Sequence, residues 1–255
     1  MSVANQHMPD PELAVELAHL AGAGAIDALP LPFLLSLMDA VEAREPYIRS
    51  RTRNVATYAV ATARHLGLSA DQIEQVLIGA ILCNLGMIRV PEAILHKQGA
   101  LTVEERTRVR HHPIRSAEML SGVPQLEPVI PIVLHHHEDW RGGGYPIGIS
   151  GERIPIGARI IRLCETYDAL TSERAYRAAH TPAEALKVIA AGSDRQFEPR
   201  VVQAFLRMMR QPPVRDEMLS RWDTLETTTR AWRIVAAAPT RAASPPAARH
   251  VSLDT

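Results

Sequence analysis

Apolar residues recur along the chain at the spacing of amphipathic helices. After Ser69 they follow at Ile73, Val76, Leu77, Ala80 and Ile81. Residues with this spacing share one face of a helix. Gln72 stands three residues after Ser69, as in a capping box, in which each side chain accepts a hydrogen bond from the other residue's backbone N–H. The pattern predicts a helix that begins after Ser69 and buries one face.

Two further capping boxes predict two more helices. Thr102 and Glu105 precede a helix that we expect to run towards Leu120. Thr181 and Glu184 form the other box, with a proline at the first helical position, where its missing N–H does no harm. Segments that alternate apolar and polar residues, as strands do, are absent from the sequence. The predicted fold class is therefore all-α.

The pattern divides the chain into four parts. Residues 1–32 predict a short helix over 11–20 and a linker, and residues 33–212 predict the main domain, with a helix over about 32–43 at its start. Residues 213–236 predict a C-terminal helix that carries Trp222 and Trp232. Residues 237–255 are rich in Ala, Pro and Ser, and such a composition predicts a disordered tail.

Composition narrows the class of protein. Lys and Arg total 28 and Asp and Glu total 28, so the formal charge is zero, and we expect neither duplex nucleic acid nor a membrane as partner. No run approaches the ~20 apolar residues that span a bilayer, and the first residues lack the pattern of a signal peptide. The two cysteines, Cys83 and Cys164, are too few for a disulfide framework. We expect a cytoplasmic protein with both thiols reduced.

A histidine cluster is the strongest chemical signal. His135, His136 and His137 leave an apolar run and meet an acidic pair, and the glycine-rich turn at 142–146 follows. Imidazole is a common metal ligand, and glycine lets a backbone approach a ligand closely. The pair His111 and His112 stands about two dozen residues earlier. A solvated turn and a surface pair are the alternatives.

The segment 162–177 adds charged residues to this set. Glu165 and Asp168 are three residues apart, so they share a helix face. Arg174 and Arg177 have the same spacing, and the guanidinium fork suits phosphate oxygens. The alternative for the two arginines is a solvated helix end.

Together these segments resemble the HD-GYP family of cyclic di-GMP phosphodiesterases over about residues 33–208. The motifs stand in the family's order: VEAREPY at 41–47, VPEAILHKQGALTVEE at 90–105, HHP at 111–113, HHHEDWRGGGYP at 135–146, IPIGARIIRLCETYDALTSERAYR at 154–177 and FEP at 197–199. The resemblance implies an HD-superfamily helical bundle with the HD-GYP extension. It also implies two or three metal ions, often iron or manganese, that generate hydroxide and clamp a phosphodiester.

Several positions depart from the family pattern. Arg51 stands in place of a metal-binding His, and Cys83 and Asn84 replace the His-Asp doublet. Met87 replaces a phosphate-binding Lys, Glu165 a ligand Asp, and Arg141 the Asp before the glycine loop. Asn84 is neutral and bridges cations poorly, and Arg51 puts a fixed positive charge where a cation would sit. We therefore expect a degenerate site that lacks a binuclear centre.

The remaining residues leave two alternatives for metal. His112, His136, His137 and Glu165, with Cys83 as a further candidate, form a set suited to one divalent ion: iron, manganese or zinc. The other alternative is no metal, with Arg51 paired to Glu165 and the histidines hydrogen-bonded. On the ligand side, Gly144, Tyr145, Arg174 and Arg177 match the family's dinucleotide contacts, and Lys97 is a further nearby cation.

Three functions follow from this combination. The first is a non-catalytic HD-GYP domain in bacterial cyclic di-GMP signalling, which binds a cyclic dinucleotide or a signalling protein. The second is a weak metal-dependent phosphodiesterase or phosphohydrolase with an altered metal site. The third is an interaction protein that docks through the helix of Trp222 and Trp232.

Overall fold

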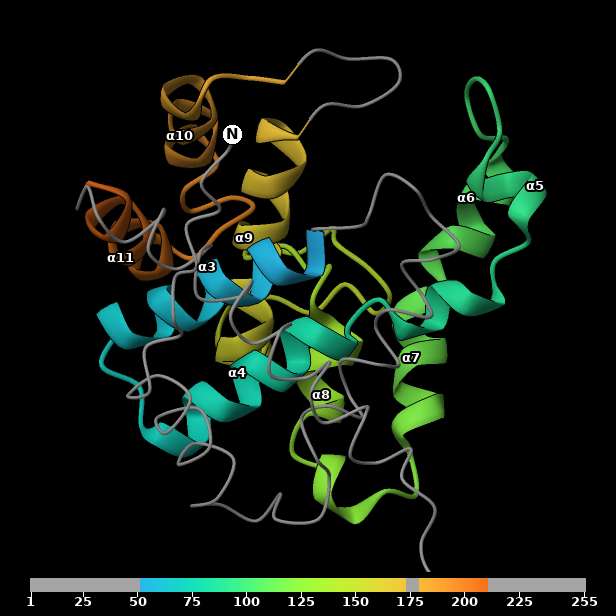
Figure 1. Cartoon of the computed structure of the whole chain (residues 1–255), viewed down its shortest axis with the longest axis horizontal. Coiled ribbons are helices and arrows are strands. Elements are labelled where there is room, and N and C mark those ends of the chain that lie inside the picture. Colours follow the sequence, from blue (N-terminus) through green and yellow to red (C-terminus); the bar gives the residue numbers. More distant parts are fainter. Residues whose placement is uncertain (1–50, 173–178, 211–255) are drawn as a thin grey trace, which may run out of the picture.

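Three helices pack pairwise at the centre of the structure: α3 (Arg51–His65), α4 (Ala70–Leu82) and α9 (Ile156–Thr171) (Figure 1). The computed structural model describes residues 51–172 and 179–210. The helices expected over 11–20, 32–43 and 214–235 lie outside the described residues, as do the predicted tail, the motif at 41–47, Arg174, Arg177, Trp222 and Trp232. Within the described residues every regular element is a helix, which confirms the all-α class.

The core lies between α9 and its neighbours. Tyr167 of α9 meets Tyr58 of α3 edge-on, with ring centroids 5.3 Å apart. Phe205 of α11 (Pro199–Met209) contacts both rings, at 5.1 Å from Tyr167 and 6.3 Å from Tyr58. Edge-on pairs are a favoured arrangement of aromatic rings. Helix α10 (Pro182–Ala191) packs against the end of this layer through α9 and α11.

The three capping boxes predicted from the sequence are all present, before α4, α6 and α10. The single helix expected from Thr102 towards Leu120 is wrong. It is two helices, α6 (Val103–Arg110) and α7 (His112–Leu120), which meet at His111. Pro113 explains the break, since proline has no N–H to continue the hydrogen bonds of α6 and is tolerated only in the first turn of a new helix.

The short helices α5 (Glu92–Leu95) and α6 form an arm, residues 92–110, that projects from the body (Figure 1). Neither helix contains a buried residue. The arm returns to the body where α7 begins.

A close backbone approach sets the position of α7. The 3-10 helix η1 (Leu85–Arg89) packs against α7, and a Cβ on Gly86 would lie 2.2 Å from the carbonyl oxygen of His112. The Gly86 N–H donates to Ser116 Oγ at 2.7 Å, and that hydroxyl donates to the carbonyl of Cys83 at 2.8 Å. Glycine at position 86 therefore brings the end of α4 and the start of α7 together.

The remaining elements complete the wall of the body. Helix α8 (Ile130–His135) packs against α4, α7 and α9, and two short 3-10 helices, η2 (Pro124–Leu126) and η3 (Gly151–Arg153), lie in the connections. Ile132 of α8 fits against two glycines, Gly79 of α4 and Gly157 of α9, whose missing side chains make room for it. Across residues 51–172 and 179–210, no helix has the length and apolar character needed to cross a membrane.

Candidate functional site

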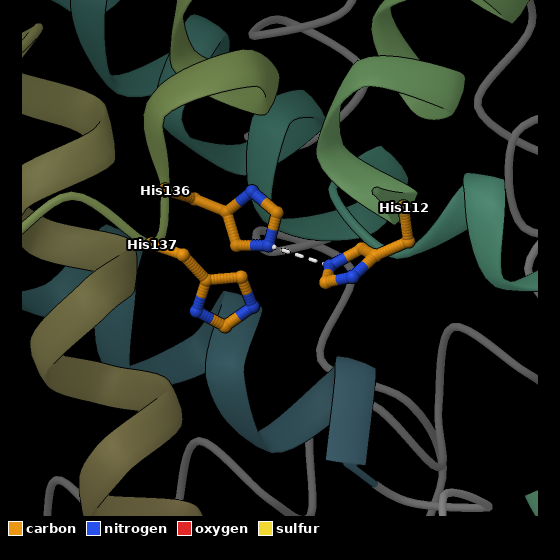
Figure 2. Close-up of side chains that lie close together, drawn as sticks. All are labelled: His112, His136 and His137. Carbon is orange, nitrogen blue, oxygen red and sulfur yellow. Dashed lines mark hydrogen bonds between the residues drawn. The ribbon is translucent and has the colours of Figure 1, made fainter. Parts of the chain in front are cut away.

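Three histidines from two helix ends converge in the body. His112 begins α7, and His136 and His137 follow α8. Their ring centroids lie 5.2, 5.0 and 4.1 Å apart, and Figure 2 shows the three rings facing a common point. His112 and His136 are buried, with 3% and 0% exposure. The sequence placed these residues in one cluster, and the structure brings them together.

Backbone carbonyls set the tautomers of two of these rings. Nδ1 of His112 lies 2.9 Å from the carbonyl oxygen of Val109, and Nδ1 of His136 lies 2.6 Å from that of Val133. Because a carbonyl only accepts, each Nδ1 carries the proton and each Nε2 is left with a bare lone pair. The two Nε2 atoms are 3.2 Å apart (Figure 2).

Two bare nitrogens at that distance repel each other unless a proton or a metal ion lies between them. The contact becomes a hydrogen bond only if one ring is protonated, and burial opposes this. Burial, followed by the charge of His136, lowers the pKa of His112 to about 3, and burial also lowers the pKa of His136. Neutral imidazole with Nδ1 fixed by a carbonyl is the form that binds metals.

Glu165 of α9 supplies a buried carboxylate to the same cluster. Its Oε2 atom lies 3.9 Å from Nε2 of His136 and 3.8 Å from Nε2 of His137. Both distances exceed hydrogen-bond length, and no hydrogen bond between described residues reaches this atom. Oε1 is engaged: it accepts from Asn84 Nδ2 at 3.0 Å. The carboxylate therefore presents one oxygen to the imidazoles.

Cys83 also lies close to that carboxylate. Its Sγ atom, a nitrogen of His136 and an oxygen of Glu165 all lie within 4.8 Å of one another, and His112, His136 and His137 form a second such group. Burial, followed by the charge of Glu165, raises the pKa of the thiol well above its usual value. Both Cys83 and Cys164 are buried and free.

The donor set fits one metal ion. Ligand atoms about 2.0–2.1 Å from a tetrahedral ion lie about 3.3–3.4 Å from each other. The separations of 3.2, 3.8 and 3.9 Å among His112, His136, His137 and Glu165 are close to this spacing. The orphaned Oε2 of Glu165 and the neutral rings are the donors that a divalent ion prefers.

Arg51 brings a fixed cation to the edge of this set. Its Nη2 lies 3.5 Å from Oε1 of Glu165, and its Nε lies 3.8 Å from Oδ2 of Asp168. Asn54 holds the other oxygen of Asp168 through its amide, at 3.0 Å. The Arg51–Glu165 pair expected in the metal-free alternative is thus present.

The glycine loop is folded tightly onto the same cluster. A Cβ on Gly144 would lie 2.4–2.6 Å from backbone atoms of residues 137–139, so only glycine fits. Tyr145, which precedes Pro146 through a cis bond, stacks on His137 with ring centroids 4.6 Å apart and 23° between planes. Arg110, the last residue of the arm, lies 4.7 Å from the centre of the Tyr145 ring. Burial, followed by the charge of Glu165, raises the pKa of Tyr145 to about 12.

The HD domain family matches residues 36–201 of the chain, which include every residue of this cluster. The chain belongs to the HD domain family.

Named relatives of this HD domain include cyclic-dinucleotide phosphodiesterases. The cyclic di-GMP phosphodiesterase response regulator RpfG of Xanthomonas campestris is 34% identical over 197 residues, 76% of this chain and 52% of that protein. A cyclic di-GMP phosphodiesterase of Pseudomonas aeruginosa is 35% identical over 182 residues, 71% and 44% of the two chains. A 3'3'-cGAMP-specific phosphodiesterase 2 of Vibrio cholerae is 31% identical over 173 residues, 67% and 33%. The chain thus spans about half the length of these relatives or less, and they confirm the resemblance drawn from the motifs.

Solved structures support the same fold. A crystal structure of a cyclic GMP-AMP specific phosphodiesterase of V. cholerae matches with a TM-score of 0.59 at 19% identity, over 73% of this chain and 50% of that one. Bd1817, a HDG"Y"P protein from Bdellovibrio bacteriovorus, matches with a TM-score of 0.54 at 17% identity, over 78% and 60%. At these identities the likeness shows the fold alone.

The remaining predicted positions of this HD domain have other partners or lie outside the described residues. Arg141 forms an ion pair with Asp194, and the two side chains are 63% and 55% exposed, so Asp194 neutralises its charge at the surface. Lys97 pairs with Glu105 on the arm, at 2.6 Å. Met87 is half-buried and packs against the hydrophobic core. Arg174 and Arg177 are not among the described residues.

Sequence reasoning missed three residues that shape the site of this HD domain. Asn54 bonds Asp168, Arg110 lies over Tyr145, and Glu138 holds the glycine loop. Glu138 is 1% exposed, and its carboxylate accepts from the backbone N–H groups of Ile147 and Gly148 at 2.8–3.0 Å. The one available signal was the position of Glu138 directly after the histidines, because an acid there, beside a glycine turn, has backbone donors within reach.

Proposed function

We propose that this HD domain acts in bacterial cyclic-dinucleotide signalling as a ligand-binding or protein-interaction module with little or no hydrolysis. The observation that carries the proposal is the position of Arg51, whose guanidinium pairs with Glu165 at the edge of the donor cluster. The named relatives act on cyclic di-GMP or cGAMP, and the ligand proposed for this chain is a molecule of the same class.

The residues present argue against efficient hydrolysis. A pair of divalent ions would supply a hydroxide and hold both oxygens of an in-line displacement. Arg51 cannot create a hydroxide, and at about 4 Å its charge would repel a second divalent cation by about 8 kcal/mol at an effective dielectric constant of about 20. Asn84 donates its amide to Glu165 at 3.0 Å, where a carboxylate would bridge two ions.

The same residues favour binding of an anion. Arg51 and Arg110 bring two guanidinium groups to the cluster and to the Tyr145 ring, respectively. A guanidinium supplies both charge and directed donors to a phosphate. Gly144 and Tyr145 of the loop, with Arg174 and Arg177, complete the proposed dinucleotide contacts. A protein partner that presents carboxylates is the related possibility for this face.

One observation supports a second candidate function. Three neutral imidazoles and the open Oε2 of Glu165 converge with the spacing of ligands around one ion. A residual phosphodiesterase or phosphohydrolase that uses a single metal would need this set. In that case His136→Ala would abolish turnover, whereas in a binding module it would leave the low background unchanged.

The deciding experiment measures metal content and cyclic di-GMP turnover on one preparation, with iron, manganese or zinc added. We expect turnover far below that of an intact HD-GYP enzyme measured beside it. The combined restoration Arg51→His, Cys83→His, Asn84→Asp and Met87→Lys should raise it, because it returns the two imidazoles, the bridging carboxylate and the phosphate contact. Turnover equal to that of the intact enzyme in the unchanged protein would refute the proposal.

Binding is tested separately by calorimetry with cyclic di-GMP and by a pull-down with wild type, Tyr145→Ala and Arg110→Ala. Loss of binding in both variants is the expected result. Arg153→Ala serves as control, because that exposed arginine lies in η3 and bonds Ser150 instead of the loop tyrosine. If wild type binds nothing through this face, the interaction-protein alternative, with Trp222 and Trp232, replaces the proposal.

A further inference from the structure

Cys83 adds a sulfur atom to the candidate metal site of this HD domain, which otherwise offers nitrogen and oxygen donors. Its sulfur shares a 4.8 Å group with His136 and Glu165, and all three side chains are buried. A buried thiol in an apolar core packs like a small hydrophobic group. This thiol faces a carboxylate and an imidazole, so packing alone does not account for its surroundings.

A second observation points to an ion in the same place. Oε2 of Glu165, in a side chain that is 2% exposed, has no hydrogen bond from any described residue. An unsatisfied buried carboxylate oxygen is strongly unfavourable. The bare Nε2 atoms of His112 and His136 face the same region. An unsatisfied oxygen and bare ring nitrogens therefore lie close to the Cys83 sulfur, whose own weak contacts are the carbonyl of Ala80 at 3.5 Å and the amide of Asn84.

Asn84 adds the hydrogen bonds that a thiolate ligand needs. Its Nδ2 lies 3.4 Å from Sγ of Cys83 and 3.0 Å from Oε1 of Glu165. An amide NH2 only donates, so it stabilises negative charge on the sulfur and leaves Oε2 as the coordinating oxygen. Outer partners of this kind orient ligands and tune the metal.

We propose that this HD domain holds one thiophilic divalent ion of the zinc class, with Cys83 as a sulfur ligand beside His136 and Glu165. His112 and His137 compete for the fourth position. Thiolate ligands favour zinc and its thiophilic neighbours, whereas oxygen-rich sites suit manganese. The thiol releases its proton to solvent when the sulfur binds, and the thiolate and the Glu165 carboxylate then balance a 2+ ion. The inference shares one assumption with the proposed function, on which it rests: the site holds one ion, where the family pattern has two or more.

Cobalt(II) is the probe, because it replaces zinc and its spectrum reports the ligand atoms. The full-length protein is stripped with chelator, exchanged into buffer and titrated with Co²⁺. We expect visible bands of a four-coordinate ion and a near-ultraviolet sulfur-to-cobalt charge-transfer band. Cys83→Ser and Cys83→Ala should both lose the charge-transfer band, with circular dichroism showing that at least one of them is folded.

The matched control is Cys164→Ser. Cys164 is equally buried and lies next to Glu165 in the chain, but it belongs to neither donor group. This variant should keep the charge-transfer band. A band that survives in a folded Cys83 variant, a band lost in folded Cys164→Ser, or the absence of any cobalt spectrum in wild type would overturn the proposal.

A competition experiment between Zn²⁺ and Mn²⁺ measures the metal selectivity of the site. Wild type should prefer Zn²⁺, and Cys83→Ser should lose most of that preference. Asn84→Ala should weaken Zn²⁺ binding by about 10–100-fold, the usual effect of removing an outer partner. A strong sulfur band together with rapid cyclic di-GMP turnover would contradict the proposed function and leave this inference standing. Weak turnover without the sulfur band would contradict this inference and leave the proposed function standing.

Discussion

Nη2 of Arg51 lies 3.5 Å from Oε1 of Glu165, and this pair sets the charge state of the buried donor cluster. Burial by itself would raise the pKa of Glu165, but the charge of Arg51, then that of His136, and the hydrogen bond from Asn84 outweigh it and lower the pKa. The carboxylate therefore stays ionised. Arg51 thus stabilises the anion that a metal would use and competes with that metal for it.

Removing this guanidinium should weaken the fold and strengthen metal binding. In chelator, we expect Arg51→Met to lower the free energy of unfolding by about 1–3 kcal/mol, because it leaves a buried anion without its partner. The lower end is expected, since the Arg51 side chain is 26% exposed. Added Zn²⁺ should restore the loss and should bind more tightly than it does to wild type. Urea denaturation and a metal titration measure both effects.

Arg141→Met is the matched control for that experiment. It removes an ion pair of the same type, with Asp194, but both partners are exposed. Such pairs contribute about 0–1 kcal/mol. Equal effects of the two substitutions on Zn²⁺ affinity would show that Arg51 exerts no specific influence on the cluster.

Gly144→Ala should displace the glycine loop. The added Cβ would meet backbone atoms at 2.4–2.6 Å, which no side-chain rotation can relieve. We expect a loss of about 1–3 kcal/mol, typical of overpacking, and loss of the Tyr145–His137 stacking, measured by denaturation and by tyrosine NMR shifts. Gly143→Asn is the control: that position has φ +85° and open space around it, and asparagine tolerates positive φ. Similar losses in both variants would count against a specific close approach at Gly144.

Local features of the fold could be predicted from the sequence, since they depend on neighbours in the chain. The capping boxes at Ser69, Thr102 and Thr181 join residues three apart, and all three are present. The break at Pro113 was readable in the same way and was missed. The prediction of one helix towards Leu120 relied on the apolar pattern and neglected the missing backbone N–H of Pro113.

The contacts that shape the site could not be predicted in this way. Asn54 bonds a carboxylate 114 positions later in the chain. No periodicity encodes the pairing of Arg110 with Tyr145, because it depends on the angle at which the arm leaves α7. The motif resemblance placed the histidines together, but the direction of each Nε2 and the engagement of Glu165 Oε1 follow from tertiary hydrogen bonds with Val109, Val133 and Asn84.

Glu138→Gln should loosen the glycine loop without altering the donor cluster directly. Both oxygens of Glu138 accept backbone N–H groups. An amide would turn one of those acceptors into a donor, and we expect a loss of about 1–3 kcal/mol. Hydrogen exchange at the Ile147 and Gly148 amides should accelerate more than exchange in α9. The control Glu118→Gln, at an exposed position, should change neither the stability nor the exchange of these amides. Unchanged exchange in Glu138→Gln would show that Glu138 does not hold the glycine loop.

The chelated protein should lose stability as the pH falls. The pKa of His112 is lowered to about 3, and burial also lowers the pKa values of His136 and His137. A histidine with a lower pKa in the folded state contributes its full stability above about pH 6.5 and loses it as the pH falls towards the folded value. Well below pH 6.5 and above its folded pKa, each such histidine lowers the free energy of unfolding by about 1.4 kcal/mol for every pH unit of acidification.

His112→Gln tests the assignment, because glutamine does not titrate in this range. The slope of unfolding free energy between pH 6 and pH 4 should become shallower by about one proton's share, ~1.4 kcal/mol per unit. An unchanged slope would mean that His112 is already protonated in the folded protein, and its contact with His136 would then be an ordinary hydrogen bond.

The α5–α6 arm has an evolutionary consequence. Since none of the residues in its two helices is buried, selection for a stable core places no restraint on their sequence. Its last residue, Arg110, nevertheless lies against Tyr145, one ring away from the imidazole of His137. The motif VPEAILHKQGALTVEE at 90–105 makes up most of this arm, so its likeness to the family pattern points to selection for the placement of the final arginine and not for core packing.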